Sequence, residues 1–166
     1  MTKKTKKTPS IYVTKPFLAP LKEYNDLLKD IWDCGILTND GQFVNQFENL
    51  ICKKFGLTNY ITFSSGTTAL QAAIKGLELE GEIITTAFTW IATVSAIKNE
   101  RCKPIFCDID EDTLNIDIKK IENHITDKTV AIMPVHVFGN PCDIDGIKKI
   151  ANRYNLKVIY DAAHAI

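Results

Sequence analysis

From Gly56 to Ile166, short β-rich runs alternate regularly with helical runs, and this alternation is the feature that most constrains the fold. The predicted strands are mostly apolar along their whole length, as strands buried on both faces are. They fall at Tyr60–Phe63, Glu82–Thr86, Pro104–Cys107, Thr129–Val135 and Lys157–Asp161. Because helical runs join them, we expect a mostly parallel sheet with helices on both faces. The sequence therefore predicts an α/β fold with three layers, α/β/α.

Helical periodicity fills the intervals between these strands and also precedes the first of them. The connecting helices are expected at Thr67–Leu79, at Trp90–Asn99, and around the two isoleucine sets Ile118, Ile121, Ile125 and Ile144, Ile147, Ile150. Two amphipathic helices, Pro20–Trp32 and Phe43–Phe55, come earlier, and each is closed by a glycine.

The charge balance and the cysteine pattern exclude several classes of protein. Twenty Lys and Arg residues balance twenty Asp and Glu residues, so no overall field draws the chain to nucleic acid or to an anionic membrane. No apolar run approaches the roughly 20 residues that a membrane helix needs, and the five cysteines form no CxxC pair. We therefore expect a cytoplasmic protein without a metal site, whose partner is a small molecule or another subunit. The lysine-rich residues 1–15 are expected to be a disordered, solvated tail.

In sheets of this kind ligands bind beyond the carboxyl ends of the strands, so the residues directly after each strand are the candidates for function. After the first predicted strand, Ser64–Leu70 places hydroxyls and Gly66 at a helix N-terminus, where free amides and the helix dipole attract anions. Simple capping of the helix by serine or threonine is the more common reason for such residues. The absence of a GxGxxG loop argues against a nicotinamide cofactor.

Three further side chains follow predicted strands. Trp90 stands between a strand and a helix, where a flat cofactor ring could stack on it, although tryptophans more often lie in a core or at a domain edge. Asp161 ends an apolar run, so its carboxylate is expected to be paired or functional, or to cap the next helix. His136 is best explained as a structural histidine bonded to its loop, and His164 as a ligand contact or a loop residue.

Five segments in a fixed order carry a resemblance to a known family. They are SSGTTAL, TTAFTWIATVSAI, KPIFCDIDEDTLNID, AIMPVHVFGNPCDID and VIYDAAHAI, preceded by GILTN. In this order and spacing they resemble the DegT/DnrJ/EryC1/StrS-type sugar aminotransferases from about Pro16 to Ile166. That family has the type I (aspartate aminotransferase) fold of pyridoxal-phosphate (PLP) enzymes, works as a homodimer, and usually moves an amino group from glutamate to a nucleotide-linked keto sugar.

The resemblance implies a role for six residues. Gly66, Thr67 and Thr68 would hold the cofactor phosphate, and Trp90 would stack on the pyridine ring. Asp161 would pair with the ring nitrogen, since a carboxylate there keeps the pyridinium proton and thereby the electron-withdrawing character of the ring. His164, where many members have glutamine, would lie near the phenolic oxygen of the cofactor.

The resemblance also implies that one catalytic group is missing from this chain. The family's Schiff-base lysine lies beyond the Asp161–His164 segment, and the sequence ends two residues after His164. Residues 16–166 are therefore expected to be the N-terminal part of the PLP-binding large domain, inactive as an isolated chain. The nucleotide sugar is expected to carry a 4-keto-6-deoxyhexose, by analogy alone.

Three alternatives stay open on the sequence. Some relatives carry histidine in place of the Schiff-base lysine and act as sugar dehydratases of the same fold. A non-catalytic product of a truncated gene that binds phosphorylated ligands is a second possibility. An unrelated nucleotide-binding domain is a third, and the missing glycine fingerprint counts against it.

Overall fold

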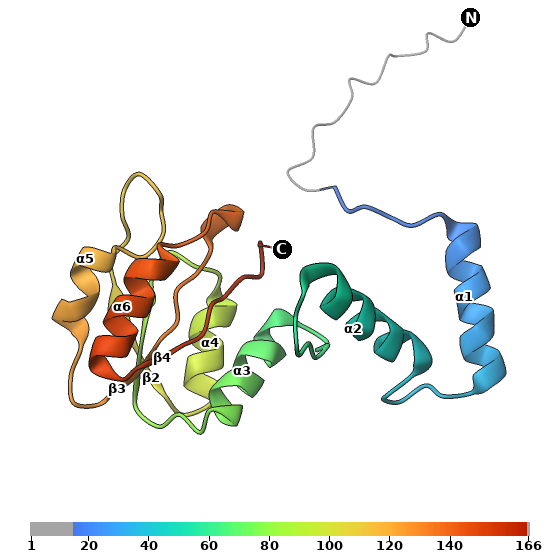
Figure 1. Ribbon diagram of the computed structural model, residues 1–166, viewed down its shortest axis with the longest axis horizontal. Helices are drawn as coiled ribbons and strands as arrows, with labels where there is room; N and C mark the ends of the chain where they lie inside the picture. The colour runs from blue at the N-terminus through green and yellow to red at the C-terminus, as the bar shows by residue number, and fades with distance from the viewer. Residues whose placement is uncertain (1–14, 166) are drawn as a thin grey trace, which may run out of the picture. The chain divides into compact units, whose positions relative to one another are not determined.

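The computed structural model describes residues 15–165, so the tail expected over residues 1–15 lies almost wholly outside the described residues. The chain divides after Tyr60 into two compact units. The first holds helices α1 (Leu21–Cys34) and α2 (Gln42–Phe55), both of which the sequence predicts (Figure 1). Each ends at a glycine with a left-handed backbone, a conformation that glycine adopts without steric cost.

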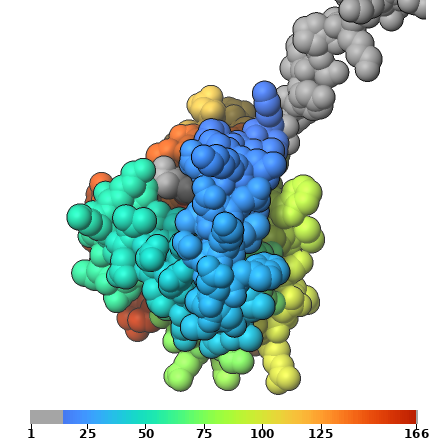
Figure 2. Space-filling model, turned by 90° about the vertical axis from the view of Figure 1, so that its right-hand side faces the viewer, coloured from blue at the N-terminus to red at the C-terminus, as the bar shows by residue number. Residues whose placement is uncertain are grey.

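The helices of this first unit keep their apolar faces uncovered. Neither of these two fully described helices has a buried side chain, and the indole of Trp32 is 74% exposed. Phe47 of α2 and Tyr60 make one edge-to-face aromatic contact, with ring centroids 6.0 Å apart. Figure 2 shows the surface of this unit in blue and turquoise. Because amphipathic helices take most of their stability from packing, the unit depends on contacts outside itself.

The second unit is built on a four-stranded sheet in the order β2-β1-β3-β4. The strands are β1 (Glu82–Thr86), β2 (Lys103–Cys107), β3 (Thr129–Ile132) and β4 (Lys157–Val158). All three pairings between them are parallel, as the sequence predicts. An isolated parallel bridge between Val135 and Asp161 continues the β3–β4 pairing past the end of both strands.

Helices cover both faces of this sheet, giving the predicted three layers. The helices are α3 (Gly66–Gly76), α4 (Ile91–Asn99), α5 (Ile118–Ile121) and α6 (Ile144–Tyr154), with 3-10 turns η1 (Glu122–His124) and η2 (Val137–Gly139). Side chains of α3 and α4 share one core cluster with Ile83, and those of α5 and α6 share another with Ile84. Successive residues of β1 thus point to opposite faces, and both are fully buried.

Four predicted elements differ from the structure. The strand expected over Lys157–Asp161 is only the two residues of β4, followed by the isolated bridge at Asp161. Tyr60–Phe63 is not a strand: no strand of the described chain pairs with it, and Ile61 is 70% exposed. The strand expected over Thr129–Val135 ends at Ile132, because Pro134 has no N–H for the ladder. The helix expected up to Ile125 is a single α turn followed by η1.

Candidate active site

The strand order of the sheet changes direction at β1, and the carboxyl ends of the strands there form the candidate site. From β1 the chain first moves to β2 on one side and then crosses to β3 and β4 on the other. The crevice at such a switch point is the usual ligand site of an open α/β sheet. Segments that follow β1, β3 and β4 meet there, and they contain Trp90, His136, Asp161 and His164.

Asp161 is held rigidly at this edge. Its backbone N–H donates to Pro134 O at 2.9 Å, and its carbonyl oxygen accepts from His136 N–H at 3.0 Å. The carboxylate is buried, with Oδ2 accepting a 2.6 Å hydrogen bond from Thr93 Oγ1 and Oδ1 accepting a 3.2 Å bond from Ala163 N–H. Each oxygen keeps a free lone pair, so the carboxylate can still accept a hydrogen bond from a cationic N–H group.

Two threonines of the α4 turn orient this carboxylate. Thr93 is fully buried, and its hydroxyl also lies 2.7 Å from Thr89 Oγ1. Neither residue was predicted from the sequence as part of the site. The available signal was their position at the start of α4, with Thr93 in its first turn and Thr89 directly before the N-cap residue.

Trp90 and His164 line one cavity of about 250 Å³ beside Asp161. Trp90 is the N-cap residue of α4 and is 79% exposed, so it is not a core tryptophan. Most of the wall is apolar or aromatic, the composition that suits a flat ring. The lining residues are Ala87, Phe88, Thr89, Trp90, Val135, Val137, Phe138 and His164. Among the described residues, neither Asp161 nor Gly66–Thr68 belongs to this lining.

Gly66–Thr68 form the first turn of α3, and Ser65 caps it. Thr68 N–H donates to Ser65 Oγ at 3.2 Å, and Ser65 N–H donates to Thr68 Oγ1 at 3.2 Å. The predicted capping is therefore present. The first amides of a helix have no partner within it, so those of Gly66 and Thr67 are available to bind an anion. Since α3 leads into the start of β1, its N-terminus faces the opposite, carboxyl edge of the sheet.

His136 has the structural role that the sequence predicts. Its Nδ1 accepts the Cys142 N–H at 3.1 Å, and its ring stacks on Tyr160 with centroids 5.0 Å apart. Burial lowers the pKa of His136, and nearby Asp161 raises it by a smaller amount. The imidazole is thus neutral with its proton on Nε2, and it fastens the loop after β3.

Two kinds of feature are absent from residues 15–165, the part of the chain that the structure describes. No group of three His, Cys, Asp or Glu side chains there is placed to hold a metal ion. None of its helices is long and apolar enough to cross a membrane.

Comparison with known proteins places these features in one family. The model of the DegT/DnrJ/EryC1/StrS aminotransferase family matches residues 21–166. The chain is 45% identical over 156 residues to a dTDP-4-amino-4,6-dideoxy-D-glucose transaminase of Escherichia coli, which covers 94% of this chain and 42% of that protein. It thus spans about two fifths of the length of the curated relatives it matches.

Solved structures agree with this result. NtdA from Bacillus subtilis with its bound cofactor PMP matches with a TM-score of 0.85 and 36% identity, over 88% of this chain and 34% of that one. A GDP-4-keto-6-deoxymannose-3-dehydratase with a trapped PLP-glutamate geminal diamine matches with a TM-score of 0.77 and 31% identity, over 86% and 39%. The predicted fold of PLP-dependent aminotransferases is confirmed. The chain belongs to the DegT/DnrJ/EryC1/StrS aminotransferase family.

Proposed function

We propose that the protein containing this chain is a PLP-dependent aminotransferase that moves an amino group from glutamate to a nucleotide-linked keto sugar. The 4-keto-6-deoxyhexose of a dTDP sugar is the proposed acceptor. In this exchange the sugar carbonyl becomes an amine, and glutamate becomes 2-oxoglutarate. The proposal rests on one observation before all others, the buried and oriented carboxylate of Asp161 at the carboxyl edge of the sheet.

The residues at this edge fit a phosphorylated aromatic cofactor. Asp161 would accept the N–H of the ring nitrogen and hold that proton, and the hydrogen bond from Thr93 would keep the carboxylate from turning away. Trp90 and His164, which line one cavity, would respectively stack on the ring and contact its phenolic oxygen. The amides of Gly66 and Thr67 at the start of α3 would bind the phosphate, in the turn that Ser65 and Thr68 close by capping each other. When bound, PLP supplies the electron sink for transamination, which no protein side chain can provide.

Similarity to the Escherichia coli transaminase supports the choice of substrate, because that protein's name specifies a 4-amino-4,6-dideoxyglucose linked to dTDP. Since the chain spans only part of such relatives, the activity of the whole protein is part of the proposal. A homodimer belongs to the proposal as well, as the family resemblance implies. So do a cytoplasmic location and the absence of nucleic-acid and membrane partners, which the charge balance, the cysteine pattern and the lack of a long apolar run lead us to expect.

The test uses the full-length protein. It should change the visible spectrum of added PLP, and with glutamate and a dTDP-linked 4-keto-6-deoxyglucose it should form an amino sugar and 2-oxoglutarate, both identified by mass spectrometry. Asp161→Asn is the matched control, because it keeps the side-chain size but removes the charge. A well-folded protein that neither binds PLP nor transfers nitrogen contradicts the proposal.

A sugar dehydratase of the same fold is the second candidate, and the match to the GDP-4-keto-6-deoxymannose-3-dehydratase favours it. That match has a lower TM-score than the match to NtdA. The same assay separates the two reactions, since a dehydratase removes a hydroxyl from the sugar and leaves no nitrogen on it.

A further inference from the structure

The loop after β3 presents a strained aromatic residue to the cavity. Phe138 has a left-handed backbone, with φ 53° and ψ 23°, although it is not glycine. Its ring is 75% exposed and meets Phe88 edge-on, with centroids 6.3 Å apart, and both rings line the cavity. A bulky residue keeps such a backbone only where its surroundings impose it, and such residues cluster at functional sites.

Asn115, from a different part of the chain, bonds to the loop on both sides of this residue. Its Oδ1 accepts the Val137 N–H at 3.0 Å, and its Nδ2 donates to the carbonyl oxygens of Asn140 and Pro141, both at 3.1 Å. These three bonds lie on either side of Phe138 and use both N–H groups and the oxygen of the amide. The side chain is buried, so none of the three bonds is readily replaced by water.

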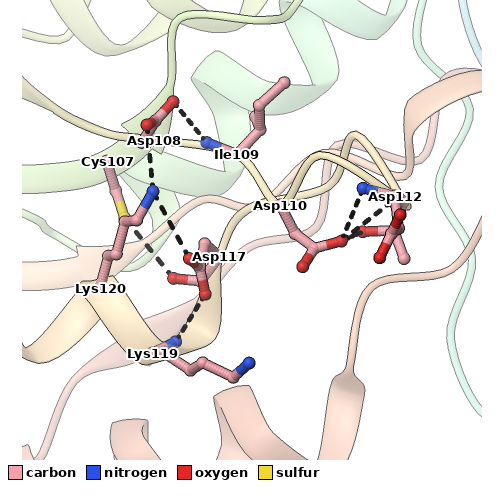
Figure 3. Close-up of polar contacts among 9 residues, drawn as sticks. Cys107, Asp108, Ile109, Asp110, Asp112, Asp117, Lys119 and Lys120 are labelled. Atoms are coloured by element: carbon pink, nitrogen blue, oxygen red, sulfur yellow. Dashed lines mark hydrogen bonds and ion pairs between the residues drawn. The ribbon is translucent and has the colours of Figure 1, made fainter.

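The segment that carries Asn115 is itself fastened by a polar network. Asp110 Oδ1 accepts from the backbone N–H and the hydroxyl of Thr113, at 2.9 and 3.0 Å. Lys120 Nζ lies 3.1 Å from Asp108 Oδ2 and 3.6 Å from Asp117 Oδ2 (Figure 3). The hydrogen bond to Lys120 lowers the pKa of Asp108, so the pair stays charged at neutral pH. These contacts hold the segment between β2 and α5 in place and thereby fix the position of Asn115.

The same loop also touches the segment that holds His164. Gly139 has φ 84°, and a Cβ atom added there would lie 2.8 Å from His164 O. The loop thus contributes Phe138 to one wall of the cavity. Its Gly139 backbone also packs against His164, which lines another wall. A displacement of the loop would change both walls together.

We propose that Asn115 is a positioning residue, which holds the Val137–Pro141 loop so that Phe138 forms a ready-made aromatic wall of the ligand cavity. The inference rests on the proposed function only for the identity of the ligand, PLP. Asn115 itself does not line the cavity, so it acts through Phe138.

The test measures PLP affinity of the full-length protein by fluorescence titration, using Asn115→Ala, Phe138→Ala and the double variant. Each single change should weaken PLP binding about tenfold, a loss of the size expected for one or two hydrogen bonds or a lost ring contact. The double variant should bind no more weakly than the worse single variant, because both changes remove the same wall. Additive losses, or unchanged affinity in Phe138→Ala, overturn the proposal.

Isosteric substitutions separate hydrogen bonding from packing. Asn115→Asp keeps the size and one acceptor but sets a negative oxygen against the carbonyls of Asn140 and Pro141, so it should weaken PLP binding at least as much as Asn115→Ala. Asn123→Asp makes the same chemical change at an exposed position of η1 and should have no effect. Equal behaviour of the two Asp variants contradicts the proposal.

A second readout needs no cofactor. In the PLP-free protein, hydrogen exchange of the peptide containing Val137–Pro141 should be faster in Asn115→Ala than in the wild type, since the Val137 N–H loses its acceptor. If the wild type does not bind PLP, the proposed function fails while this measurement still tests the role of Asn115. Unchanged exchange in a folded Asn115→Ala protein overturns that role.

Discussion

The hydroxyl of Thr93 donates a 2.6 Å hydrogen bond to the buried Oδ2 of Asp161, across 68 residues of sequence. Thr93→Val removes the donor and keeps the side-chain shape. Because a buried carboxylate then loses a partner, the free energy of unfolding should fall by about 1–3 kcal/mol, as measured by urea denaturation of the full-length protein. Thr58→Val, at an exposed position, is the control. Identical unfolding curves for both variants would show that the bond adds no stability.

Asp161→Asn should leave PLP bound but remove most of the turnover. The phosphate and stacking contacts do not involve this side chain, whereas an amide cannot hold the pyridinium proton by charge. We expect kcat to fall at least about tenfold, equivalent to 1.4 kcal/mol of lost transition-state stabilisation. Steady-state kinetics with glutamate and the keto sugar nucleotide measure this effect. Near-normal turnover would remove Asp161 from the proposed role.

Trp90→Ala should chiefly weaken cofactor retention. Ring stacking contributes about 0.5–1.5 kcal/mol beyond the burial of area, which corresponds to a several-fold rise in the dissociation constant for PLP. Trp90→Phe keeps a flat ring and should recover most of the affinity. If both variants bind PLP like the wild type, the cavity beside Trp90 does not hold the ring.

The buried cysteines should resist alkylation in the native protein. Burial raises the pKa of Cys107 and of Cys142, each to about 11. At pH 8 only roughly one thiol in a thousand is then the reactive thiolate. Exposed Cys34 should therefore react with iodoacetamide first, as followed by mass spectrometry of digested protein. Early labelling of Cys107 or Cys142 without unfolding would contradict this order.

Gly139→Ala should destabilise the loop after β3. The new methyl group would meet His164 O at 2.8 Å, and φ 84° is strained for any residue with a side chain. The free energy of unfolding should fall by more than about 1 kcal/mol. Gly76→Ala is the control, since a Cβ there meets nothing within 4 Å. A Gly139→Ala protein as stable as the control would show that the loop adjusts to the methyl group without a loss of unfolding free energy.

The strand and helix pattern was predictable where burial on both faces governs the sequence. Glu82–Thr86 is a strand with the predicted bounds, because every residue of it is buried in the centre of the sheet. Tyr60–Phe63 carries the same β-rich signal but belongs to no strand of the sheet within residues 15–165. Composition alone cannot distinguish these cases, since a strand is defined by hydrogen bonds to a distant segment.

The site was predictable only in its outline. Asp161 could be predicted because burying a carboxylate at the end of an apolar run is costly unless the group is paired or functional. Thr93 and Asn115 could not be predicted, because small polar residues are common in helices and loops. Their hydrogen-bond partners lie 68 and 22–26 residues away in the sequence. The left-handed backbone of Phe138 could not be predicted either, because a bulky residue rarely adopts it.

The parallel order of the sheet also determines how this protein can reach its native state. β1 pairs with β3 through Glu82 and Thr129, and no tight turn can bring two such segments together. The entropy of closing these loops is lost before the pairing is gained, so assembly of the sheet is slow compared with helix formation. During that interval α3 and α4, which lie close in sequence, can already pack on each other. The amides of β1 should accordingly gain protection from solvent only after those of the two helices, so the apolar residues at the centre of the finished sheet stay open to aggregation longest.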